Sequence, residues 1–225
     1  MIKREESFII FNGEMVRAIL EGRKTQTRRP IKGKVLLYFI DFMTGHADEV
    51  PGNTEDLGQI WEGNKIRLYS AEYPEEGSEL FDCPYGKIGN RLWVKETWGI
   101  DNLNYNCPSK CSIKYYADDS TKDFKRFPLK NRDKYLGQYQ RRPSIHMPRW
   151  ASRITLEITG IRVERVREIS VTDCLKEGVH PCRPLDDFGK EINIFKDLWD
   201  GIYAKTFPWT ENPWVWVITF KVVKQ

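Results

Sequence analysis

Long hydrophobic runs are missing from this 225-residue chain. The longest, residues 35–43, contains Asp41 and is too short to cross a bilayer. Four of the first six residues, MIKREE, are charged, and no apolar signal core follows them. We therefore expect a cytoplasmic protein without a membrane partner.

Motifs for common cofactors are also missing. The chain has no P-loop, no dinucleotide fingerprint and no Ser-His-Asp arrangement, so we predict no cofactor. Its cysteines are odd in number, which indicates reduced thiols rather than a disulfide framework. No paired Cys-x2-Cys spacing is present, although a zinc site formed by Cys83, Cys107 and Cys111 stays open, to which His180 and Cys182 could add ligands.

Charge is abundant but unevenly distributed. The net charge of +4 is too small to imply nucleic acid by itself. Residues 17–34 carry seven cations and one acid, and residues 137–153 carry four arginines and no acid. Such clusters suit a phosphate-bearing partner, RNA or DNA, although solvated surface clusters are the commoner meaning of a charge run.

Hydrophobic periodicity predicts many strands and few helices. We expect helices at 14–21, 170–177 and 191–204, and strands at 7–11, 34–43, 65–69, 91–98, 113–117, 154–166 and 214–223. Polar stretches at about 44–62 and 118–143 are interpreted as long loop insertions. The fold class is therefore α+β, mainly β, and we interpret residues 1–225 as one domain, a small barrel with insertions and short flanking helices.

Residues 22–30, GRKTQTRRP, are here called the basic segment. It directly follows the first expected helix and interleaves two threonine hydroxyls with its cations, Arg23, Lys24, Arg28 and Arg29. Pro30 disfavours any helical continuation. We expect this segment to form the floor of a pocket that tolerates an anion.

Several sequence blocks resemble the ASCH domain, which has a PUA-like β-barrel fold. They are GRKTQTRR at 22–29, GNRLWV at 89–94, DCLKEG at 173–178 and the aromatic ending NPWVWV at 212–217. CPYGK at 83–87 and IHMPRWASRI at 145–154 make ASCH proteins of phages and prophages the nearest match. The resemblance covers about residues 8–223 outside the two expected loops. It implies a PUA-like (ASCH) barrel in the cytoplasm of a bacterial host.

Two functions follow from that resemblance. ASCH and PUA-like modules bind RNA or read modified bases, which suggests a cleft beside Lys24 for nucleic acid, a nucleobase or a nucleoside. Some small ASCH proteins are amidohydrolases that remove the acetyl group of N4-acetylcytidine. By resemblance, the catalytic residues of that reaction would be Lys24, Thr27 and Glu177.

The chemistry of these residues supports either function. A threonine hydroxyl is a poor nucleophile until a base takes its proton. A lysine can be that base if burial or neighbouring cations lower its pKa. Glu177 could orient Lys24 or pass a proton to the leaving amine. Alternatively, Lys24 binds phosphate or solvent while Thr27 caps a turn.

The remaining candidates would contact a base or its phosphates: Arg23, Arg28, Arg29, Arg149, Trp150 and Arg153. Trp150 lies between Arg149 and Arg153, where it could stack on a base or plug the barrel. Glu96, flanked by tryptophans, either enters the barrel or faces solvent.

Overall fold

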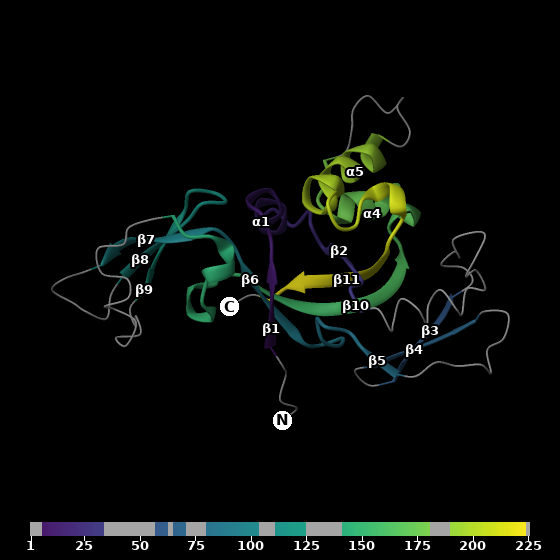
Figure 1. The fold of residues 1–225 in the computed structure, drawn as a ribbon. Helices are drawn as coiled ribbons and strands as arrows, with labels where there is room; N and C mark the ends of the chain where they lie inside the picture. Colours follow the sequence, from purple (N-terminus) through teal and green to yellow (C-terminus); the bar gives the residue numbers. More distant parts are fainter. Residues whose placement is uncertain are drawn as a thin grey trace. The chain divides into compact units, whose positions relative to one another are not determined.

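The computed structural model describes residues 6–33, 57–62, 65–70, 80–103, 111–124, 141–180 and 190–223. The chain divides into two compact units, each described by itself. Unit 1 comprises residues 1–5, 23–91 and 157–221, and unit 2 comprises residues 6–22, 92–156 and 222–225. Strands dominate in both (Figure 1), which confirms the α+β, mainly β class. The described strands form three open sheets and no closed barrel.

Unit 1 contains the basic segment. Its strands are β2 (Gln26–Pro30), β3 (Leu57–Glu62), β4 (Lys65–Ser70), β5 (Leu80–Asp82) and most of β10 (Thr155–Arg165) and β11 (Trp214–Val222). Its helices are α4 (Val171–Lys176) and α5 (Lys190–Tyr203), with short 3-10 turns at Val166–Glu168 and Trp209–Glu211. Strand β11 lies between β10 and β2, and β3, β4 and β5 form a separate antiparallel sheet.

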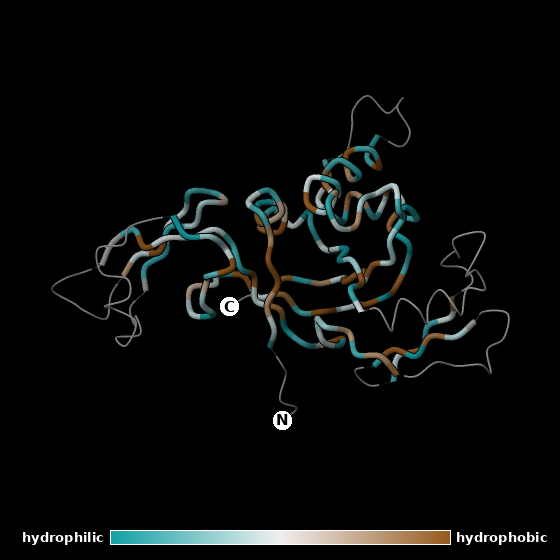
Figure 2. The backbone as a smooth tube through the Cα atoms, viewed as in Figure 1, coloured by the Kyte–Doolittle hydropathy of each residue, from teal (hydrophilic) through white to brown (hydrophobic). Residues whose placement is uncertain are grey.

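The core of unit 1 lies between β11 and the two helices. Val215 and Val217 of β11 pack with Cys174 of α4 and with Phe195 and Trp199 of α5. Hydrophobic colour follows much of β11 in Figure 2, and Trp214 to Ile218 are all buried. A continuous apolar run is typical of a strand covered on both faces. This core supports β11, the strand with which β2 pairs.

Unit 2 contains the N-terminal strand and helix. Its elements are β1 (Glu6–Ile10), α1 (Gly13–Leu20), most of β6 (Arg91–Lys95), β7 (Trp98–Leu103), β8 (Cys111–Tyr115), β9 (Thr121–Phe124) and 3-10 turns at Ser144–His146 and Arg149–Ala151. Strand β1 lies beside β6, and β7, β8 and β9 form an antiparallel sheet. Trp98, Ile113 and Tyr115 are central to its core, together with Met147 and Ala151.

Local signals account for the helix boundaries. The Asn12 side chain accepts a hydrogen bond from the Met15 N–H at 2.9 Å and caps α1. The Ser170 hydroxyl accepts from the Asp173 N–H at 3.1 Å and caps α4. Gly178 has φ +95°, a conformation that glycine adopts without strain, and ends α4 as predicted.

Three strand predictions differ from the structure. Residues 57–62, expected in a loop, form β3, which pairs antiparallel with β4. Gly58 lies against the ring of Tyr69 on β4, and a Cβ added to Gly58 would lie 2.0 Å from that ring. Residues 121–124 of the second expected loop form β9. The expected strand 91–98 is interrupted between Lys95 and Trp98.

Some expectations from the sequence fall outside the residues that the structure describes. The expected strand 34–43 and the loop residues 44–56 and 125–140 lie outside the described residues. The interpretation of residues 1–225 as a single domain stays a prediction. In the described part of the chain, none of the helices has both the length and the apolar character needed to span a membrane.

Candidate functional site

The basic segment is held between α4 and β11. The Thr25 N–H donates to the Lys176 carbonyl at 2.8 Å, and the Phe220 N–H donates to the Thr25 carbonyl at 2.8 Å. From Gln26 onward the backbone is strand β2, paired antiparallel with β11. No strand was predicted here from the sequence, because the pairing partner lies about 190 residues further along the chain.

Lys24 and Glu177 form a buried ion pair. The Lys24 Nζ lies 2.7 Å from Glu177 Oε2 and also donates to the Glu177 backbone carbonyl at 2.8 Å. The Lys24 side chain is fully buried, and that of Glu177 is 4% exposed. Glu177 is the C-cap of α4, so the end of this helix presents both acceptors to the lysine. Two of the three residues predicted to act in catalysis are therefore in direct contact.

Arg28 connects three carboxylates. Its Nε donates to Glu164 Oε1 at 2.9 Å, and its Nη2 contacts the same oxygen and Asp173 Oδ2, the latter at 2.9 Å. Its Nη1 lies 3.3 Å from Glu177 Oε1. The Arg28 side chain is fully buried, and its guanidinium lies 5.9 Å from the centre of the Phe195 ring. Arg28 was predicted to bind a base or phosphate, but all of these contacts are internal.

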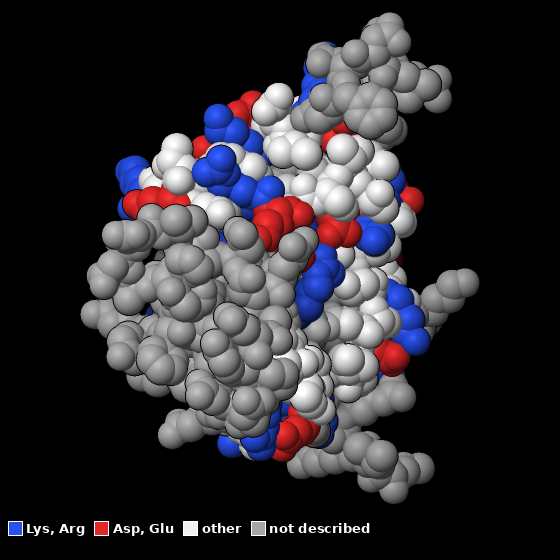
Figure 3. Space-filling view, turned by 90° about the vertical axis from the view of Figure 1, so that its right-hand side faces the viewer, with Lys and Arg blue, Asp and Glu red and all other residues white. Residues whose placement is uncertain are grey.

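A second arginine supports two of these carboxylates from the solvent side. Arg162 donates from Nε to Glu164 Oε2 at 2.7 Å and from Nη2 to Asp173 Oδ2 at 2.6 Å. The Arg162 side chain is 40% exposed. Acidic and basic side chains also lie next to one another on the face seen in Figure 3. The cations of this region are thus largely balanced by neighbouring acids.

Burial changes the ionisation of the site. Removal from water lowers the pKa of Lys24, and the nearby Arg29 and Arg28 charges lower it further, although Glu177 opposes the shift. Partial burial works to raise the pKa of Asp173, but hydrogen bonds and charges from Arg28 and Arg162 hold it at about 2. The site thus combines a lysine that loses its proton more easily with a carboxylate, Asp173, that stays ionised.

Thr27 is buried on β2, in register with Ile218 of β11. Within the described residues, no hydrogen bond joins its side chain to Lys24 or Glu177. Side chains alternate along a strand, so Thr27 and Arg28 point to opposite faces of β2. The structure therefore brings Lys24 to Glu177 but leaves the threonine hydroxyl unconnected to either.

The other two cations of the basic segment also have internal contacts. Arg23 Nη1 donates to the Gly178 carbonyl at 2.6 Å, just beyond the end of α4. Arg29 Nη1 donates to the Tyr203 hydroxyl at 3.1 Å at the end of α5. Both arginines are partly buried, so they brace the segment against the two helices of unit 1.

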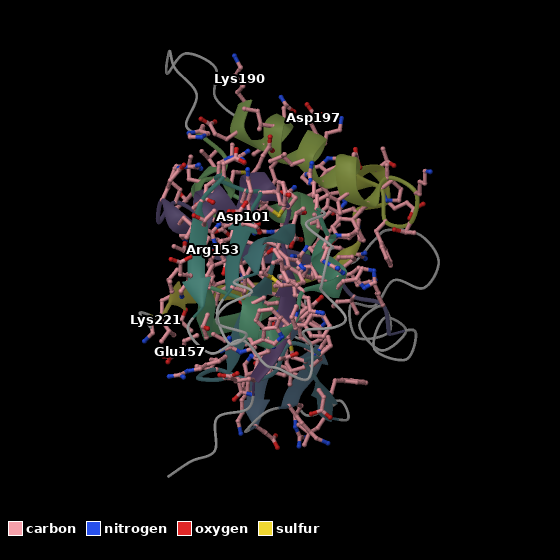
Figure 4. The ribbon with its side chains drawn as sticks, turned by 90° about the vertical axis from the view of Figure 1, so that its left-hand side faces the viewer. Asp101, Arg153, Glu157, Lys190, Asp197 and Lys221 are labelled. Carbon is pink, nitrogen blue, oxygen red and sulfur yellow. The ribbon has the colours of Figure 1, made fainter. Side chains whose placement is uncertain are left out.

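The remaining predicted base-binding residues lie in unit 2. Arg153, labelled in Figure 4, donates to both Glu96 oxygens, at 2.9 and 2.8 Å, and also contacts Asp118. Glu96 is 1% exposed, which settles its orientation in favour of the interior. Arg149 pairs with Glu6 at 3.0 Å. Trp150 packs against the core of unit 2, edge-on to Trp98 with ring centres 5.9 Å apart.

Sequence reasoning missed Glu164 and assigned no role in the site to Asp173. Glu164 interrupts the apolar pattern of the expected strand 154–166, and such a charge in a buried strand was the available signal. Among the described residues, no group of three His, Cys, Asp or Glu side chains could hold a metal ion. Cys83 and Cys111 are buried free thiols, and Cys107 and Cys182 lie outside the described residues.

Comparisons with family models, with curated proteins and with solved structures each found no match. The candidate site therefore has to be judged on its own geometry.

Proposed function

We propose that this chain is a PUA-like ASCH protein of phage or prophage origin that binds a modified nucleobase, nucleoside or nucleic acid beside Lys24. The observation that carries the proposal is the buried Lys24–Glu177 pair, with Nζ and Oε2 2.7 Å apart. Buried ion pairs are often no more stabilising than apolar side chains of the same volume. A cluster of such groups with shifted pKa values is therefore a better candidate for function than for stability alone.

The pair matches the hydrogen-bonding edge of a base. A carboxylate accepts hydrogen bonds from amino and ring N–H groups, and an ammonium donates to a carbonyl oxygen. Cytosine and its N4-modified forms present both kinds of group on one edge. Lys24 and Thr27 are each 1% exposed, so ligand entry requires the side chains that cover them to move.

Calorimetric titration of the full chain with cytidine, with N4-acetylcytidine and with single-stranded RNA and DNA oligonucleotides tests the binding proposal. We expect Glu177→Gln to weaken binding by on the order of tenfold or more, because it removes a charged acceptor from the base edge. Lys221→Met is a matched control, because Lys221 pairs with Glu157 at the surface of the same unit and is 63% exposed. Equal affinity in wild type and Glu177→Gln contradicts the proposal.

A second function, amidohydrolysis, is favoured by the lowered pKa of Lys24. In this reaction Lys24 takes the proton of Thr27, and the Thr27 Oγ attacks the acetyl carbonyl of N4-acetylcytidine. The C–N bond breaks, the amine leaves as cytidine with a proton passed through Glu177 or Lys24, and water then releases acetate from the acyl-threonine. Nucleophilic attack requires the Thr27 hydroxyl to reach Lys24.

Chromatography of cytidine released from N4-acetylcytidine tests this second function. Turnover that is lost in Lys24→Met, Thr27→Ala and Glu177→Gln supports the assignment of all three residues. Turnover that persists in Thr27→Ala rules out Thr27 as the nucleophile. If wild type binds the nucleoside but releases no cytidine, the chain is a binding protein alone.

A further inference from the structure

Arg28 has an arrangement that suits a supporting role better than contact with a ligand. Its side chain is fully buried, and all three guanidinium nitrogens donate to carboxylates from β10 and from α4 and its C-cap. The fork of an arginine is rigid and planar, so three contacts fix its position in space. A ligand would have to displace at least one of these ion pairs to reach it.

The two oxygens of the Glu177 carboxylate are divided between two cations. Oε2 lies 2.7 Å from Lys24 Nζ, and Oε1 lies 3.3 Å from Arg28 Nη1. Because Arg28 is anchored to Glu164 and Asp173, it limits how the Glu177 carboxylate can rotate. The rotation of that carboxylate in turn decides which oxygen meets Lys24.

We propose that Arg28 is a positioning residue, which holds the Glu177 carboxylate so that its second oxygen stays on Lys24. This inference rests on the proposed function at Lys24 and Glu177 but assigns Arg28 a role inside the protein rather than at a phosphate. Glu164 and Asp173 are the anchors of Arg28, and Arg162 holds these anchors from outside without contacting Glu177.

The charges around Lys24 agree with this role. Apart from burial, the groups that act on the pKa of Lys24 are Glu177 at the end of α4 and Arg28 and Arg29 on β2. Glu177 raises that pKa, and the two arginines lower it. Loss of the Arg28 charge alone would therefore raise the pKa of Lys24, whereas movement of the Glu177 carboxylate away from Lys24 would lower it.

Arg162 provides a matched control. It contacts the same two anchors as Arg28, at 2.7 Å to Glu164 and 2.6 Å to Asp173, but does not reach Glu177. A merely structural contribution to the ion-pair cluster should be disturbed by Arg162→Met as well as by Arg28→Met. Because the Arg28 charge also acts on Lys24, a positioning role is distinguished by Arg28→Lys, which keeps the charge but should still change the pKa of Lys24.

The test is a pH titration of the Lys24 side chain by NMR in the full chain labelled with 13C-lysine, with its Cε resonance assigned by its loss in Lys24→Met. We expect the pKa of Lys24 to fall in Arg28→Lys, because Glu177 is no longer held on Lys24, and to be unchanged in Arg162→Met. In Arg28→Met, loss of the arginine charge opposes this fall. Arg28→Lys keeps the charge but can meet only one carboxylate, so it isolates the orientation of Glu177. In a Glu177→Gln background, the effect of Arg28→Lys should disappear, because it acts through that carboxylate.

Nucleoside affinity supplies the second readout. With N4-acetylcytidine as the probe, we expect Arg28→Lys to lose affinity on the order of 10- to 100-fold, because small misplacements of a binding group are costly. If Arg28→Met does not fold by near-UV circular dichroism, Arg28→Lys alone decides the question. If no nucleoside binds to wild type, the proposed function fails, but the Lys24 titration still tests the role of Arg28. Equal shifts in Arg28 and Arg162 variants, or no shift in Arg28→Lys, overturn the inference.

Discussion

Each unit of this protein contains an arginine bound by carboxylates, fully buried in unit 1 (Arg28) and partly buried in unit 2 (Arg153), and the two clusters differ in their other members. In unit 2, Arg153 spans Glu96 and Asp118, donates to the Ser120 hydroxyl at 2.7 Å and lies 4.1 Å from the centre of the Tyr115 ring. That cluster contains no lysine. In unit 1, one of the carboxylates around Arg28, that of Glu177, is shared with Lys24, a group that can lose a proton.

The comparison separates a structural ion pair from a site with reactive potential. The Arg153 guanidinium satisfies both oxygens of Glu96 by itself, so the cluster is complete without another group. Glu177 is instead divided between two cations, and one of them is a lysine whose pKa is lowered by burial. The way in which the surrounding carboxylates are shared is therefore a better indicator of a functional site than the presence of the arginine itself.

The largest expected effect is on the stability of unit 1. Arg28→Met leaves Glu164, Asp173 and Glu177 without their shared buried cation, and we expect a loss of about 3–5 kcal/mol in the free energy of unfolding. Urea unfolding followed by circular dichroism measures this change. The partly exposed Arg162→Met should lose less than about 1 kcal/mol. Equal losses would mean that burial of the arginine does not distinguish the two positions.

A smaller loss is expected from the corresponding change in unit 2. Arg153→Met removes the partner of buried Glu96, but Asp118 keeps access to water, with a side chain that is 29% exposed. We expect destabilisation of about 1.5–3 kcal/mol by urea unfolding. Arg153→Lys should recover only part of it, because a lysine cannot bind Glu96 through two nitrogens. Nucleoside binding at Lys24 should not depend on this residue, and a large loss of affinity would contradict the structural role.

At alkaline pH, the stability of the protein should depend on Lys24, which belongs to the Arg28 cluster of unit 1. The folded-state pKa of Lys24 is lowered from its ordinary value of 10.5, so between the two pKa values the unfolded chain binds more protons. The contribution of Lys24 to unfolding free energy therefore rises as pH increases through that window. Lys24→Met should remove this rise in urea titrations at successive pH values. Parallel curves for wild type and Lys24→Met would show that the lysine titrates as it does when unfolded.

The smallest expected effects are at acid pH. Despite some burial, hydrogen bonds from arginine hold the pKa values of Asp173 and Asp118 at about 2, below the ordinary 3.8. Each carboxylate therefore adds stability that is present above about pH 4 and is lost as pH falls toward 2. Asp173→Asn and Asp118→Asn should each flatten the acid limb of a stability profile measured by urea unfolding. A limb as steep in either variant as in wild type would contradict the contribution of that residue.

Short-range features were predictable from the sequence. Caps such as Asn12 and Ser170 and the terminating Gly178 act within a few residues of themselves. Apolar alternation indicated β10, and a continuous apolar run indicated β11. Strand β3 was missed because Gly58 was interpreted as a loop residue, although it makes room for Tyr69 of a neighbouring strand. The reason that Gly58 fits in a strand is therefore found in Tyr69 of β4 and not in residues 57–62 themselves.

The sequence by itself determined the mainly β class, the helix boundaries and the candidacy of Lys24, Thr27 and Glu177. Only the tertiary structure decided which of them meet, because Lys24 and Glu177 are separated by 153 positions in the chain. It also showed that Arg28 and Arg153, both expected to contact a ligand, form internal ion pairs. The physical reason is that caps and periodicity depend on neighbours in sequence, whereas the partner of a buried charge depends on which distant strands and helix ends are packed beside it.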